Sequence, residues 1–128
     1  MRRFPDIAVR VASSRRDDFE EVSEVLGSRV SVFVLAAAMG KKESLRKPLP
    51  VGKRSKDKWT SLAYFPPHLI AVMIALFSDE SKDMSMGAIS KVAEEYAGGG
   101  IAYLRALVSD GDISRLSTLL SVYIGGDT

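Results

Sequence analysis

The residues best suited to chemistry are eight lysines and arginines in residues 41–58 of the 128-residue chain. They are Lys41, Lys42, Arg46, Lys47, Lys53, Arg54, Lys56 and Lys58. Only two acids, Glu43 and Asp57, lie among them, so this stretch carries +6 while the whole chain carries +2 and the remainder −4. Cations spaced along a flexible segment neutralise phosphates and release counterions. The stretch therefore predicts a basic loop, at about 41–58, that contacts the phosphates of DNA.

Aromatic and further basic residues could complete such a surface. Trp59, Tyr64 and Phe65 follow the stretch, and aromatic rings stack on exposed bases. Five arginines would extend the patch if they fold nearby: Arg2, Arg3, Arg10, Arg15 and Arg16. Two alternatives stay open: a solvated loop that only aids solubility, and a loop that attracts an acidic protein partner.

The sequence gives little support for a metal site or for a catalytic nucleophile. The chain has one histidine, His68, and no cysteine, so no metal site and no cofactor are expected. A histidine just after Pro66-Pro67, at a helix start, is better explained by a local hydrogen bond. No Gly-x-Ser-x-Gly motif is present, so no catalytic residue is assigned.

Two smaller features are weighed against simpler explanations. Gly98, Gly99 and Gly100 could form a turn that offers bare N–H groups to an anion at the start of a helix beginning at Ile101. A helix cap with a tight turn is the favoured explanation, because no Walker lysine and serine follow the run. Glu94 and Glu95, beside Tyr96, would suit a small enzyme only if all three side chains converge in a pocket with shifted pKa values.

The elements that must position these residues are mostly helices. Apolar periodicity predicts helices over 17–26, 30–39, 66–77, 85–97, 101–108 and 113–123, with Gly40 and the glycine run as helix ends. Residues 2–14 alternate like a strand, and 59–65 favour a short one. We predict one domain over 1–128, all-α or mainly α, as a compact bundle of five to six helices. The alternative to an all-α bundle is a mainly α bundle that also contains one small strand pair, near the N-terminus and Trp59.

Composition limits the cellular setting. Apolar residues make up 46% of the chain, enough for a core. Phe4-Pro5-Asp6 follows the basic start where a secretory signal would be apolar, and the runs at 32–39 and 69–77 are too short to span a bilayer. A cytoplasmic protein without membrane contact is expected, in line with the absence of cysteine.

Three stretches together resemble a known family. They are Val32 to Gly40, Arg46-Lys47-Pro48-Leu49, and Ala93 to Ile101 with its Glu-Glu-Tyr-Ala-Gly-Gly-Gly sequence. They resemble the small proteins associated with Dnd systems, the fourth type in the usual naming, from about Phe19 to about Leu120. An asparagine of the family motif is replaced here by Gly98, and the basic loop is long.

The resemblance implies the biological system in which the protein acts, and it implies no enzymatic reaction. Dnd systems place sulfur on the DNA backbone and act with restriction modules against phage. The expected function is a non-enzymatic DNA-binding accessory protein of a prokaryotic DNA-modification and phage-defence system. The alternative is a protein-interaction subunit that docks onto a larger nuclease or ATPase, for which an exposed apolar patch is the expected sign.

Overall fold

The computed structural model describes residues 5–52 and 55–124, without the side chain of Ile113. The described chain holds five α-helices and one pair of antiparallel strands. The helices are α1 (Arg16–Leu26), α2 (Arg29–Lys42), α3 (Pro67–Phe77), α4 (Met86–Asp110) and α5 (Ile113–Leu119). The strands are β1 (Ala8–Ala12) and β2 (Lys56–Ser61). A mainly α fold with a small strand pair near the N-terminus and Trp59 is therefore confirmed.

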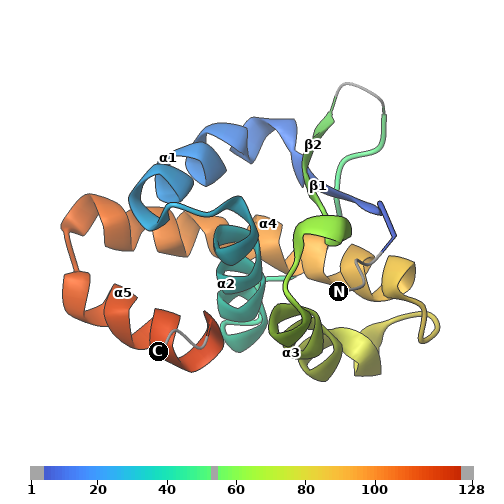
Figure 1. Ribbon diagram of the computed structural model, residues 1–128. Coiled ribbons are helices and arrows are strands. Elements are labelled where there is room, and N and C mark those ends of the chain that lie inside the picture. The colour runs from blue at the N-terminus through green and yellow to red at the C-terminus, as the bar shows by residue number, and fades with distance from the viewer. Residues whose placement is uncertain (1–4, 53–54, 125–128) are drawn as a thin grey trace.

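Helix α4 is the central element (Figure 1). Helix α2 crosses it in the most extensive contact of the molecule, while α1, α3 and β1 also pack on it. One core of buried side chains reaches from Val9 on β1 to Leu119 on α5. Short turns of other helix types extend the elements at Ser13–Arg15, Leu62–Tyr64, Ser78–Glu80 and Leu120–Ile124.

The helix starts follow from local sequence. Ser28 and Ser85 lie ahead of α2 and α4, and each hydroxyl accepts a hydrogen bond from a backbone N–H of the first turn. Asp112 does the same for α5. Pro67 begins α3, where its missing N–H costs nothing.

The prediction that the glycine run ends a helix was wrong. Helix α4 continues through Gly98, Gly99 and Gly100 as one element of 25 residues, so the two predicted helices at 85–97 and 101–108 are one. Gly40 likewise does not end α2, which continues to Lys42. Gly40 and Gly100 bring α2 and α4 close together, and the gain from that contact outweighs their weak helix propensity.

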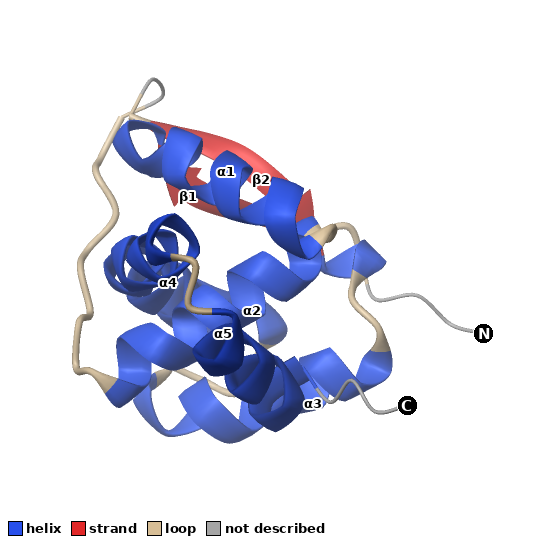
Figure 2. Ribbon diagram, turned by 90° about the vertical axis from the view of Figure 1, so that its left-hand side faces the viewer, coloured by secondary structure: helices blue, strands red, loops and turns tan. Residues whose placement is uncertain are grey.

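The prediction of a loop over 41–58 was wrong at both ends. Lys41 and Lys42 form the last turn of α2, and Lys56 to Lys58 belong to β2, which begins three residues before Trp59. Strand β2 pairs with β1 in a register running from Ala8 opposite Ser61 to Ala12 opposite Lys56. The connecting segment runs along the outside of α4 (Figure 2), where the N–H of Lys47 donates to the carbonyl of Glu95.

Within the described residues, no single helix is both long and apolar enough to cross a membrane. The segments Ser13–Leu26 and Arg29–Lys42 meet the length and composition criteria only when taken together, and a bend of 115° separates them.

Candidate nucleic-acid interface

The eight predicted phosphate-contacting residues do not form one patch. Lys41 and Lys42 lie at the end of α2, whereas Lys56 and Lys58 lie on β2 at the opposite side of the molecule (Figure 1). Lys53 and Arg54 lie outside the described residues. The fold therefore separates residues that are neighbours in the sequence.

Two of the eight basic residues form ion pairs with acidic side chains. Lys41 Nζ lies 3.1 Å from Glu80, and Arg46 lies 3.1 Å from Glu80 and 2.6 Å from Glu95. The hydroxyl of Tyr96 donates to the same Glu80 at 2.6 Å, and this hydrogen bond is the main reason that the pKa of Glu80 is lowered. This cluster joins the end of α2 to α4, so its cations are already neutralised by protein.

Other basic residues of the stretch are less constrained. Lys58 lies 3.9 Å from Asp6, a long and exposed pair. The ion pairs among the described residues do not include Lys42, Lys47 or Lys56. Lys42 and Lys47 are exposed and Lys56 is partly buried. These three cations can still contact phosphates.

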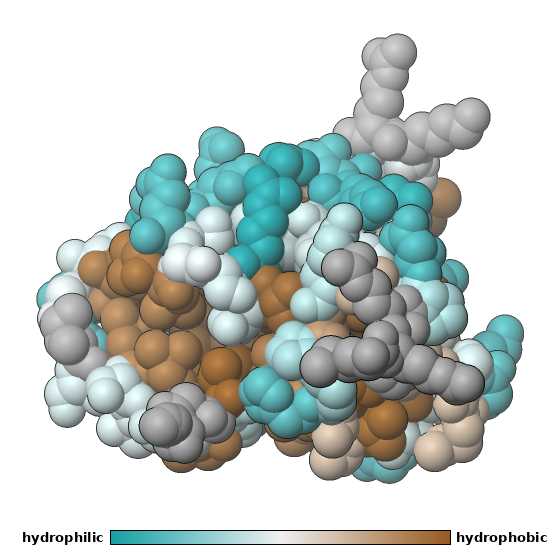
Figure 3. All heavy atoms as spheres, viewed as in Figure 1, coloured by the Kyte–Doolittle hydropathy of each residue, from teal (hydrophilic) through white to brown (hydrophobic). Residues whose placement is uncertain are grey.

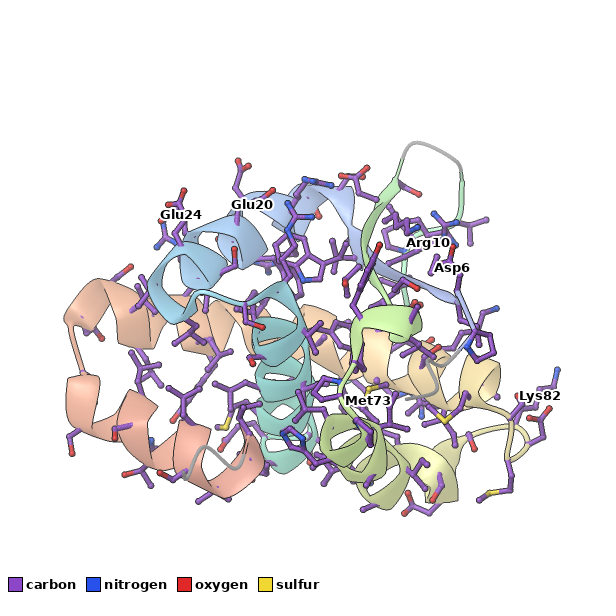
Figure 4. All side chains as sticks on the ribbon, in the orientation of Figure 1. Asp6, Arg10, Glu20, Glu24, Met73 and Lys82 are labelled. Atoms are coloured by element: carbon purple, nitrogen blue, oxygen red, sulfur yellow. The ribbon has the colours of Figure 1, made fainter. Side chains whose placement is uncertain are left out.

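A second group of cations surrounds a hollow between the strand pair and α4. The hollow has a volume of about 580 Å³, and Arg10, Lys56 and Lys91 line it together with the buried Glu94. Figure 4 shows Arg10 on β1, beside β2. Arg10 is one of the five arginines expected to extend the patch, whereas Lys91 is not among the predicted residues. Arg15 and Arg16 instead pair with acids, chiefly on α1.

Trp59 cannot stack on a base in this structure, and that prediction was wrong. Its ring is 2% exposed, and it packs against Phe19 with ring centroids 5.4 Å apart. The indole N–H donates to the carbonyl of Arg29 at 3.0 Å, and the Arg29 guanidinium covers the ring. Phe65 is also buried, whereas Tyr64 is 65% exposed.

The buried indole gives a direct prediction. Trp59 is the one tryptophan of the chain, so fluorescence excited selectively at tryptophan reports on it alone. We expect blue-shifted emission and little quenching by iodide, which does not enter the core, and strong quenching after unfolding in denaturant. Strong iodide quenching of the native protein would show that the ring is accessible.

The glycine run is not an anion-binding turn. Gly98, Gly99 and Gly100 lie inside α4, where backbone N–H groups belong to the helix, so there is no helix start at Ile101. A Cβ on Gly99 would lie 1.6 Å from the carbonyl oxygen of Leu45, and one on Gly100 would lie 1.9 Å from that of Ala36. The run thus allows close backbone contact. Gly98 faces open space instead.

Glu94, Glu95 and Tyr96 do not converge. Glu94 points to the hollow beside β1, where its carboxylate accepts a hydrogen bond from the N–H of Arg10 at 2.9 Å. Glu95 pairs with Arg46, and Tyr96 stacks on Phe77. Burial raises the pKa of Glu94 to about 7. A shared catalytic site of these three residues is therefore not formed.

An apolar hollow lies on another part of the surface. It measures about 510 Å³ and lies between the end of α1, the start of α2 and the C-terminal helix. Figure 3 shows hydrophobic atoms gathered there, below α1 and above α5. Its apolar lining comprises Val25, Leu26, Leu116, Leu120 and Ile124. This is the kind of exposed patch expected of a docking surface.

The remaining candidates have structural explanations. The His68 ring lies 3.2 Å from the carbonyl of Ile124, so it joins α3 to the C-terminal turn. In residues 5–52 and 55–124 no group of three or more metal-ligating side chains is gathered.

No protein-family model, curated protein or solved structure matches the chain.

Proposed function

We propose that this protein is a non-enzymatic, DNA-binding accessory protein that contacts phosphates through the cationic hollow and its rim. One observation carries the proposal: Arg10, Lys56 and Lys91 come from three different elements and surround a single hollow. No ion pair among the described residues involves any of them. Cations that no direct ion pair neutralises can attract a polyanion.

The rim adds to this surface. Lys47 lies on the segment outside α4, and Lys58 lies opposite Arg10 in the strand pair. The interface that we propose therefore keeps Lys47, Lys56 and Lys58 from the basic stretch and adds Arg10 and Lys91. It leaves out Lys41, Arg46 and Trp59, and also Lys42, which lies at the end of α2 and does not line the hollow. The setting in a prokaryotic DNA-modification and phage-defence system rests on the sequence resemblance, and the proposed cytoplasmic location rests on the absence of cysteine.

Salt dependence tests the proposal. We expect fluorescence anisotropy to detect binding to single-stranded, duplex or phosphorothioated DNA at low salt, with the affinity falling steeply as salt increases. The double variant Lys56→Ser/Lys91→Ser should reduce the slope of log affinity against log salt for duplex DNA by about 2, because each lost phosphate contact removes about 0.9.

The control removes the same charge elsewhere. Lys42→Ser/Arg115→Ser also loses two cations, but neither lines the hollow. Its salt slope should stay close to that of the unaltered protein. Equal losses in the two double variants would show that net charge, and not this surface, governs binding, and an affinity insensitive to salt would contradict the proposal.

A second function is favoured by the apolar hollow. The protein would then be a subunit that docks a larger nuclease or ATPase through the surface around Val25, which is 55% exposed. Val25→Asp would abolish assembly with that protein, while the fold and any DNA binding remain. Assembly unaffected by Val25→Asp would exclude this surface as the docking site.

A further inference from the structure

Two acids, the exposed Asp83 and the buried Glu94, also line the cationic hollow, and a phosphate-binding surface does not need a buried acid. The hollow's volume of about 580 Å³ falls within the range of small-ligand sites. Strand β1 contributes Arg10, strand β2 contributes Lys56, and the first turns of α4 contribute Lys91 and Glu94. Glu94 is 6% exposed, so its carboxyl group lies at the inner wall of the hollow and not at its rim.

The charges facing Glu94 come from every element around it. Arg10, Lys56 and Lys91 each favour its ionised form through space. Asp83, ahead of α4, lines the same hollow, and Glu95 lines a smaller adjoining one. Glu95 is paired with Arg46, so the field at Glu94 is dominated by the three cations.

Burial nevertheless outweighs these cations. Removal of the carboxyl group from water is the largest influence on Glu94 and disfavours its charge, so that its pKa rises to about 7. Both protonation states are therefore populated near neutral pH. A small change in the electrostatics of the hollow is enough to decide between them.

An entering phosphate would make that change. Its negative charge would lie close to the carboxylate, and like charges in one hollow disfavour ionisation of the weaker acid. It would also draw the three cations to itself, which removes their support for the ionised form. With a proton from solvent, Glu94 becomes neutral and gains an O–H that can donate to a phosphate oxygen.

We propose that this hollow binds a phosphate group together with one proton, which Glu94 takes up from solvent as the phosphate enters. The inference rests on the proposed function, since it concerns the same surface. It adds that Glu94 couples the affinity to pH. Proton uptake on binding means that affinity rises as pH falls, by linkage.

The test measures affinity for a phosphodiester, whose charge does not change in this range. A rhodamine-labelled oligothymidine is titrated with the full chain at pH 6 and pH 8 at constant salt. We expect binding about tenfold tighter at pH 6, the change for one proton on a group that titrates near 7. Glu94→Gln should bind at both pH values about as tightly as the unaltered protein does at pH 6.

Two controls locate the effect and the source of the phosphate. His68→Gln should keep the tenfold ratio, because His68 lies on α3 and does not line the hollow. Inorganic phosphate is added as a competitor at pH 7. Displacement at millimolar concentration supports a site for free phosphate, and persistence of the complex supports one for the nucleic-acid backbone.

The outcomes separate this inference from the proposed function. If the ratio of the affinities at pH 6 and pH 8 is the same in Glu94→Gln as in the unaltered protein, the role of Glu94 is overturned, even if salt-sensitive DNA binding persists. Loss of the ratio in His68→Gln would also overturn it. If no oligonucleotide binds at any salt or pH, the proposed function itself fails.

Discussion

Gly100→Ala should destabilise the protein by about 3 kcal/mol, the upper end of the usual range for forced overpacking. The new Cβ would lie 1.9 Å from the carbonyl oxygen of Ala36 and 2.6 Å from the amide nitrogen of Gly40. Both atoms belong to the backbone of α2, so no side chain can move aside. Helices α2 and α4 would have to separate, and the core lies between them. Urea denaturation followed by circular dichroism gives the free energy of unfolding.

Gly98→Ala is the matched control for this substitution. Gly98 lies two residues away in the same helix, but a Cβ there meets nothing within 4 Å. Alanine should therefore stabilise α4 by up to about 1 kcal/mol, the difference in helix propensity. Similar effects of the two substitutions would contradict the close approach of α2 and α4.

Glu94→Gln should stabilise the protein at alkaline pH by up to about 3 kcal/mol relative to the unaltered chain, since 1.36 kcal/mol corresponds to one pKa unit. The native pKa of Glu94 is raised from 4.5 to about 7, so the native state binds this proton more tightly than the unfolded state. Stability from Glu94 is therefore present below about pH 4.5 and is lost as the pH rises to about 7. Glutamine keeps an oxygen for the N–H of Arg10 but carries no charge.

The measurement is the free energy of unfolding of both proteins between pH 4.5 and pH 8. The difference between them should grow through this interval and level off above pH 7. Glu95→Gln serves as a control, because it removes the neighbouring carboxyl group, which is paired with Arg46 and does not line the hollow around Arg10. If the free energies of unfolding of Glu94→Gln and the unaltered protein change in parallel with pH, ionisation of Glu94 does not destabilise the native state.

Sequence patterns predicted those elements whose signals are local. Helix α1 carries a single apolar face, and α3 begins at Pro67, so periodicity and proline placement located both closely. The glycine run misled prediction because a glycine signals a helix end by its backbone freedom. Here the absence of a Cβ matters instead, through contact with Leu45 and Ala36, and that contact depends on the tertiary fold.

The candidate interface was only partly predictable, for a similar reason. Lys56 and Lys58 were included because they lie in a basic run, yet Lys41 and Arg46 belong to the same run and are neutralised by Glu80, an acid far along the chain. Lys91 is an isolated lysine in the sequence. Its spacing of three residues from Glu94 places both on neighbouring positions of a helix surface, which was the one signal available. The burial of Glu94 depends on the packing of β1 against α4, and no local pattern specifies that contact.

The most direct test of DNA contact through the cationic hollow is a titration of the ¹⁵N-labelled full chain with a short DNA, followed by NMR. We predict that the largest backbone amide shifts fall on Arg10, Lys56, Lys91 and their neighbours, and that they diminish as salt is added. Shifts concentrated around Val25, Leu116 and Leu120, or no shifts at low salt, would contradict the account.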